Sequence, residues 1–167
     1  MVTFTKDSEK ENVIAQYWPQ IGRAASGYEN RSALSDELAQ EMALSVWRSL
    51  DSYKGQCSLN TYVYRVIHNT AIDHIRRYSK ISEDELDETI ICEHTSPEED
   101  ALRAQRQKQL CNAVNKLPLS LSQVMLLKLE DLNNVEISEV LGISGANVGI
   151  RLHRAKEQLT KLLAEIN

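Results

Sequence analysis

Residues 135–159 read VEISEVLGISGANVGIRLHRAKEQL, and this stretch decides the predicted fold of the C-terminal part of the chain. Gly142 is placed to end a first helix, and Ser144 to cap a second one. The second helix carries a single apolar stripe, at steps of four, three and four residues, formed by Val148, Leu152, Ala155 and Leu159. The pattern predicts two helices joined by a tight turn, the unit that reads the major groove of DNA.

The free face of the second predicted helix carries DNA-compatible side chains, namely Ser144, Asn147, Arg151 and Arg154. Arginine forms two hydrogen bonds to guanine, asparagine does the same to adenine, and a basic side chain neutralises phosphate. Ile150 is placed to contact a thymine methyl group. Taken alone, the segment also fits an ordinary helical hairpin packed into a core, and this alternative stays open at this point.

Length and composition exclude several classes of protein. The 167 residues suffice for one domain or two small ones. There is no apolar run long enough for a membrane span and no secretory signal at the start, so we expect a cytoplasmic protein that does not insert into membranes. Cys57, Cys92 and Cys111 are far apart and form no CxxC, which indicates reduced thiols and neither disulfide nor zinc site.

Enzymatic and metal chemistry find no support in the residue pattern. His68 and His74 are six residues apart, so one helix face does not carry both, and His74 is expected to pack in the core. The chain has no nucleophile–base pair, no metal-ligand spacing and no glycine-rich phosphate loop. We therefore expect a protein that is not an enzyme and that needs no metal or cofactor.

The negative net charge of the chain is concentrated in one short segment. The net charge is −5 overall, yet it is +1 over residues 1–80, −9 over residues 81–102 and +3 over residues 103–167. The middle segment contains Pro97 and lacks both helical and strand periodicity. We interpret it as an acidic linker. The alternative is a solvated loop that has no specific function. A global charge argument against DNA binding therefore fails.

Helical patterns on both sides of this segment predict an all-α protein. They cover residues 10–25, about 32–50, 61–78, 103–116 and about 120–130, ahead of the helix pair. We predict two small helical domains, residues 1–80 and 103–167, joined by the linker of residues 81–102.

Two segments together resemble one family, the extracytoplasmic-function sigma factors of bacterial RNA polymerase. Residues 36–77, DELAQEMALSVWRSLDSYKGQCSLNTYVYRVIHNTAIDHIRR, resemble sigma domain 2, with an acidic helix, a glycine-containing loop and an N-x-x-x-D-x-x-R-R helix. Residues 117–159, LPLSLSQVMLLKLEDLNNVEISEVLGISGANVGIRLHRAKEQL, resemble sigma domain 4. Each motif alone is moderately specific, whereas both in this order around an acidic linker are highly specific.

The resemblance implies a partner and a surface for it. Four polar side chains match the face that docks on the clamp helices of core RNA polymerase: Asp36, Glu37, Gln40 and Glu41. An acidic, amide-bearing face is suited to pairing with arginine, whereas its simpler explanation is a favourable interaction with the helix dipole. The resemblance also implies promoter DNA as a partner, and it admits an anti-sigma protein as another.

The resemblance implies roles in promoter opening as well. The loop of residues 55–60 matches the segment that captures a flipped base of the −10 element, and Gln56, Ser58 and Asn60 are able to bond an exposed base edge. Tyr62 and Tyr64 match aromatic positions near the place where promoter DNA is melted. Packing within the domain is an equal alternative for both. Arg76 and Arg77 match positions suited to DNA phosphates, while Asn69 and Asp73 match polar positions that fix the loop.

The implied function is that of an initiation factor that binds core polymerase, reads the −35 element with its last helix pair and opens the −10 element. In the family, the linker threads toward the RNA exit path. Gly149 departs from the family, which often has a basic residue there, so the promoter preference of relatives does not carry over. The alternative is a stand-alone helix-turn-helix regulator that does not bind polymerase.

Overall fold

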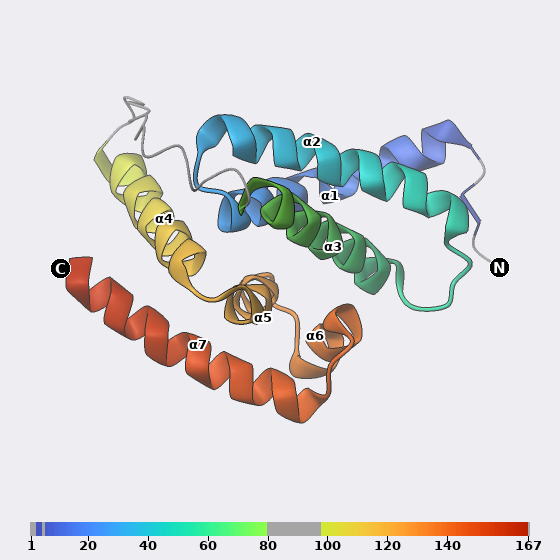
Figure 1. Cartoon of the computed structure of the whole chain (residues 1–167). Helices are drawn as coiled ribbons and strands as arrows, with labels where there is room; N and C mark the ends of the chain where they lie inside the picture. The colour runs from blue at the N-terminus through green and yellow to red at the C-terminus, as the bar shows by residue number, and fades with distance from the viewer. Residues whose placement is uncertain (1–2, 5, 80–97, 167) are drawn as a thin grey trace.

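The computed structural model describes residues 3–4, 6–79 and 98–166, and over these residues the protein is entirely helical, without strands (Figure 1). The all-α prediction is therefore confirmed. In chain order the elements are α1 (Asp7–Tyr28), α2 (Ser32–Ser49), the 3-10 turn η1 (Leu50–Ser52), α3 (Leu59–Ser79), α4 (Glu98–Lys116), α5 (Leu119–Leu129), α6 (Asn134–Leu141) and α7 (Gly145–Ile166).

Helices α1, α2 and α3 pack against one another along apolar stripes of helical period. The fully buried side chains at this contact include Ile21, Leu38, Met42, Val63 and Ile67. His74 is buried with them, as predicted, and its Nε2 atom lies 3.3 Å from a carboxylate oxygen of Glu29. α1 continues through Pro19 as one helix.

Helices α5, α6 and α7 form the predicted helix pair and the support behind it. Gly142 ends α6 with φ of 68°, the left-handed conformation that suits glycine. The side chain of Asn133 and that of Glu136 form a capping box at the start of α6. The Oγ atom of Ser144 accepts a hydrogen bond of 3.1 Å from the amide of Asn147, so the predicted cap of α7 is confirmed.

α4 begins at Glu98, earlier than the start predicted at Arg103 and inside the predicted linker. Acidic residues interact favourably with the N-terminal end of a helix, so the charge that suggested an extended chain also suits a first helical turn. The remaining acidic linker residues, 81–97, lie outside the described residues, and so does the predicted free thiol of Cys92.

Candidate nucleic-acid interface

The outer face of α7 carries the side chains predicted to read DNA. The opposite face is fixed in the core by Val148, Leu152, Ala155 and Leu159. Ser144 and Arg154 are exposed, whereas Asn147 and Arg151 are half-buried. The guanidinium Nε of Arg151 donates a 3.2 Å hydrogen bond to Asn147 Oδ1, one helical turn earlier. The structure therefore brings these four residues together at the cap and along the first half of α7.

Two further side chains share this exposed surface. Ile150 is 53% exposed, a position open to an approaching methyl group. His153, which sequence reasoning passed over, is also exposed, and its Nε2 atom lies 3.3 Å from Glu157. The missed signal was its phase, because residue 153 lies next to Ile150 on the side of α7 away from the apolar stripe.

The acidic face of α2 is exposed at Asp36, Glu37 and Gln40 and partly exposed at Glu41. A carboxylate oxygen of Glu41 accepts a 2.6 Å bond from Arg77 Nη2 at the end of α3. The hydroxyl of Tyr78 lies 3.4 Å from Glu37 Oε1. Two groups of residues predicted for different partners, polymerase and DNA, are thus in direct contact.

The loop between η1 and α3 is held by its own hydrogen bonds. Gly55 makes the turn with φ of 78°. The hydroxyl of Tyr53 donates to the carbonyl of Cys57 at 2.7 Å, and Gln56 Oε1 accepts from the amide of Lys54 at 2.7 Å. Ser58 Oγ accepts from the amide of Thr61 at 3.1 Å at the start of α3. The loop is shaped before any ligand arrives, with Gln56 and Ser58 exposed.

Asn60 and Tyr62 lie at the base of this loop and are half-buried. Asn60 Oδ1 accepts a 3.1 Å bond from the Tyr17 hydroxyl, which leaves the amide NH2 of Asn60 for another partner. Tyr62 donates to the carbonyl of Ser49 at 2.7 Å. Tyr64, by contrast, is 4% exposed, so the packing alternative holds for this residue. Burial and the carboxylate of Glu130 raise the pKa of its phenol.

The polar residues that were predicted on α3 lie in two places, two in its middle and two in its last turn. Asn69, Asp73, Arg76 and Arg77 are exposed, and the two arginines lie in the last turn. Basic side chains at a helix C-terminus interact favourably with its dipole, and a guanidinium group is chemically suited to phosphate.

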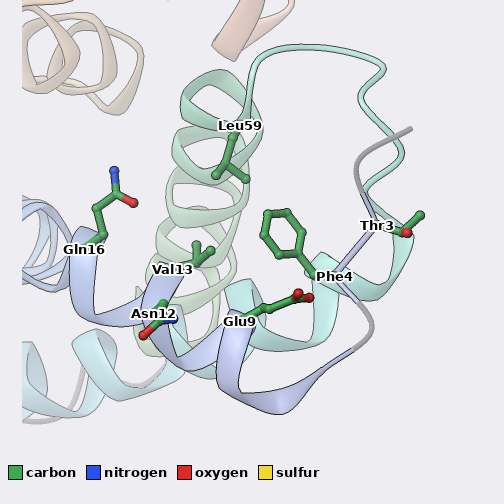
Figure 2. A pocket seen from close by; sticks show the side chains of 7 residues that line it. All are labelled: Thr3, Phe4, Glu9, Asn12, Val13, Gln16 and Leu59. Carbon is green, nitrogen blue, oxygen red and sulfur yellow. The ribbon is translucent and has the colours of Figure 1, made fainter.

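A cleft of about 370 Å³ adjoins the loop on the side of α1 (Figure 2). Phe4, Val13 and Leu59 supply apolar surface, and the remaining lining residues are polar: Thr3, Glu9, Asn12 and Gln16. The Phe4 ring also contacts that of Tyr53, with 6.0 Å between centroids. Sequence reasoning missed this cleft because its walls come from the N-terminal residues, α1 and α3, which only the fold brings together.

Among the described residues, no group of three or more histidine, cysteine or acidic side chains is arranged to hold a metal ion. No helix within the described part is long and apolar enough to cross a membrane.

Comparison with known proteins decides the family. Residues 13–81 match the model of Sigma-70 region 2, and residues 107–159 match that of Sigma-70, region 4. The chain belongs to the extracytoplasmic-function sigma factors. As such a sigma factor it is a transcription initiation factor that binds core RNA polymerase and promoter DNA. The region 2 match decides against a stand-alone helix-turn-helix regulator.

Related sigma factors align along nearly the whole chain. The RNA polymerase sigma factor YlaC of Bacillus subtilis is 28% identical over 158 residues, which cover 90% of each chain. The sigma factor SigW of the same organism is 26% identical over 143 residues, covering 79% of this sigma factor and 76% of SigW. The sigma-E factor of Haemophilus influenzae is 24% identical over 158 residues, covering 88% and 83% of the two chains.

Two solved structures share the fold of this sigma factor. CnrH in complex with the cytosolic domain of CnrY has a TM-score of 0.70 at 18% identity, covering 98% of this chain and 92% of that one. RpoE in complex with the anti-sigma factor NepR from Bartonella quintana has a TM-score of 0.71 at 15% identity, covering 92% and 96%.

Proposed function

We propose that this sigma factor divides promoter recognition between residues 1–80, which dock on polymerase and open the −10 element, and residues 103–167, which read the −35 element. Residues 81–102 join the two domains in this proposal. The observation that carries it is the outer face of α7, where Asn147, Arg151 and Arg154 lie on a helix whose other face is buried. A capped, rigid helix with such a face fits the major groove.

In the first domain, the proposal assigns polymerase binding to Asp36, Glu37, Gln40 and Glu41. It assigns −10 contacts to Gln56, Ser58, Asn60, Tyr62, Arg76 and Arg77. The exposed acidic face of α2 supports the first assignment because exposed carboxylates suit arginine on a partner. The preformed loop supports the second, since a flipped base needs polar groups already in place.

We also propose where the chain acts and which further partner it has. The chain itself catalyses no covalent reaction, needs no cofactor and works in the cytoplasm beside the polymerase. An anti-sigma protein is a further partner in this proposal, supported by the two similar structures, one of which is a sigma factor bound to an anti-sigma factor.

Run-off transcription tests the proposal directly. Purified chain, core polymerase and a library of promoter sequences are combined, and the enriched templates are sequenced. We expect transcription that depends on the chain and templates that share two elements at fixed spacing. A chain that fails to bind core polymerase in a pull-down contradicts the proposal. A single enriched element, insensitive to changes in α7, contradicts the division between the two domains.

A further inference from the structure

The side chains of Asn147 and Arg151 form one hydrogen-bonded unit on the outer face of α7. Arg151 Nε donates to Asn147 Oδ1 at 3.2 Å, from a position four residues later in the helix. The guanidinium Nε is a donor only, so the atom that faces it is the amide oxygen of Asn147 and not the amide nitrogen. The contact therefore fixes which end of the Asn147 amide is used within the protein.

This unit is oriented by the helix cap and by the core. The backbone amide of Asn147 donates to Ser144 Oγ at 3.1 Å, inside the cap of α7. Val148 and Leu152, which follow Asn147 and Arg151 in the chain, are buried and fix the rotation of the helix. Asn147 and Arg151 are themselves half-buried. Their hydrogen-bonding groups are thus in place before DNA arrives, which lowers the ordering cost of binding.

The bond between them determines which groups the unit presents to DNA. Side chains four residues apart meet along the surface of a helix, so Asn147 Oδ1 points along α7 toward Arg151. Asparagine reads adenine by accepting from N6 while it donates to N7, which requires its oxygen to face the base. With that oxygen engaged, the groups left for DNA are the amide NH2 of Asn147 and the Nη groups of Arg151, and all of these are donors.

The four bases differ in how well they match a unit of donors. Guanine presents two acceptors, N7 and O6, on its major-groove edge and no donor. Adenine and cytosine each place an amino group there, which would face the amide NH2 of Asn147 without bonding to it. Thymine offers one acceptor, O4, beside its methyl group. Guanine is therefore the best match, although asparagine as a residue type is better suited to adenine.

We propose that Asn147 selects guanine over adenine at the base pair it contacts, because Arg151 holds its oxygen away from the base. Arg151 then has two effects on promoter choice. It makes its own contact with DNA, and it is a positioning residue for Asn147. The inference rests on the proposed reading of the −35 element by α7, and it names the base that one residue of that face selects.

Transcription from a promoter library randomised at the −35 element tests this inference, with core polymerase and the full chain. Asn147→Ala identifies the base pair that Asn147 contacts, as the pair at which the preference disappears. In wild type this pair should be G·C. In Arg151→Ala the released oxygen is able to accept from adenine N6, so the ratio of A·T to G·C templates at the same pair should rise about tenfold, within the discrimination of one bidentate contact. A ratio between templates is measurable even where total transcription falls.

Arg154→Ala is the matched control, because it removes an arginine from the same face about two turns after Asn147. It should lower transcription and leave the preference at the Asn147 base pair unchanged. The double variant Asn147→Ala with Arg151→Ala should show no preference at that pair, which assigns the adenine preference of Arg151→Ala to Asn147. Circular dichroism verifies that each variant keeps the helicity of wild type.

The possible results separate this inference from the function on which it rests. A preference for A·T at the Asn147 base pair in wild type overturns the inference. An equal preference in wild type and Arg151→Ala also overturns it, as does an Asn147→Ala variant that loses preference at no base pair. A wild type without base preference anywhere in the −35 element contradicts the proposed function of α7 instead.

Discussion

Arg77 Nη2 lies 2.6 Å from Glu41 Oε2, so a residue proposed to hold promoter phosphate is paired with a residue proposed to hold polymerase. The two side chains come from the end of α3 and the middle of α2. Polymerase arginine binding Glu41 would release Arg77 toward DNA. We therefore predict that docking and DNA contact are linked at this pair.

Removing Glu41 and removing Arg77 should have different consequences. Glu41→Ala should weaken core polymerase binding roughly tenfold, the effect of losing a hydrogen bond to a charged group. Arg77→Ala should leave core binding unchanged or slightly tighter and should reduce opening of the −10 element. Because the pair lies at the surface, with Arg77 exposed and Glu41 partly exposed, each change should alter the free energy of unfolding by less than about 1 kcal/mol. Fluorescence anisotropy with core polymerase and permanganate reactivity of promoter thymines measure the two effects, and identical profiles for both variants contradict the linkage.

Arg151→Ala should cost about 1–3 kcal/mol in use of the preferred −35 sequence and relax preference at one base pair. The change also removes the hydrogen bond to Asn147. Lys161→Ala, later on the same exposed helix, is the control and should act weakly and uniformly across promoters. Competition between promoter variants in the transcription assay measures the difference. A uniform loss for Arg151→Ala would assign it to phosphate.

Gln56→Ala and Asn60→Ser should change preference within the −10 element and leave −35 preference intact. Asn60 also accepts the Tyr17 hydroxyl, so Tyr17→Phe is the matched control, since it removes that bond and retains the amide. We expect Tyr17→Phe to preserve the −10 preference. The preference is measured by sequencing transcripts from a promoter library randomised at the −10 element. A loss of transcription from all templates in both Asn60→Ser and Tyr17→Phe would indicate a structural role for Asn60.

Gly149 stands where the resemblance to the family implies a basic residue, and the structure leaves room for a side chain. A Cβ atom there would meet no atom within 4 Å. Gly149→Ala should therefore stabilise the protein by about 1 kcal/mol through helix propensity. Gly142→Ala is the contrasting control, because φ of 68° makes alanine unfavourable there. Gly149→Arg should also raise DNA affinity and steepen its salt dependence. Thermal unfolding and anisotropy with duplex DNA measure these effects.

Stability should fall at acidic pH because of His68. Burial lowers its pKa to about 3, whereas an unfolded histidine has a pKa of about 6.5. Between these values the unfolded chain binds more protons, so the contribution of this group is fully present above about pH 6.5 and is lost as pH falls toward 3. The free energy of unfolding should change with pH by about 1.4 kcal/mol per pH unit at most. This limit follows from the usual relation of about 1.36 kcal/mol per unit of pKa. Urea unfolding of the wild type and His68→Gln across this range measures it, and equal slopes refute the assignment.

Local patterns predicted much of the fold and the placement of the side chains on the outer face of α7. The apolar stripe of α7, its serine cap and the glycine before it depend on residues within a turn or two of each other. The same helical period places Asn147, Arg151 and Arg154 on the outward face of α7. The full length of α4 was missed because acidic residues suit both an extended chain and a helix N-terminus.

The sequence by itself determined the helices, the two family motifs and which side chains lie on the outer face of α7, because helical periodicity and capping are local. Tertiary structure alone decided that Glu41 pairs with Arg77, that Phe4 lines a cleft beside the loop between η1 and α3, and that Tyr64 is buried. It also decided that Glu130 receives Arg23 from α1, 107 residues away in the chain. These pairings depend on which helices lie against one another, and no periodicity within one helix contains that information.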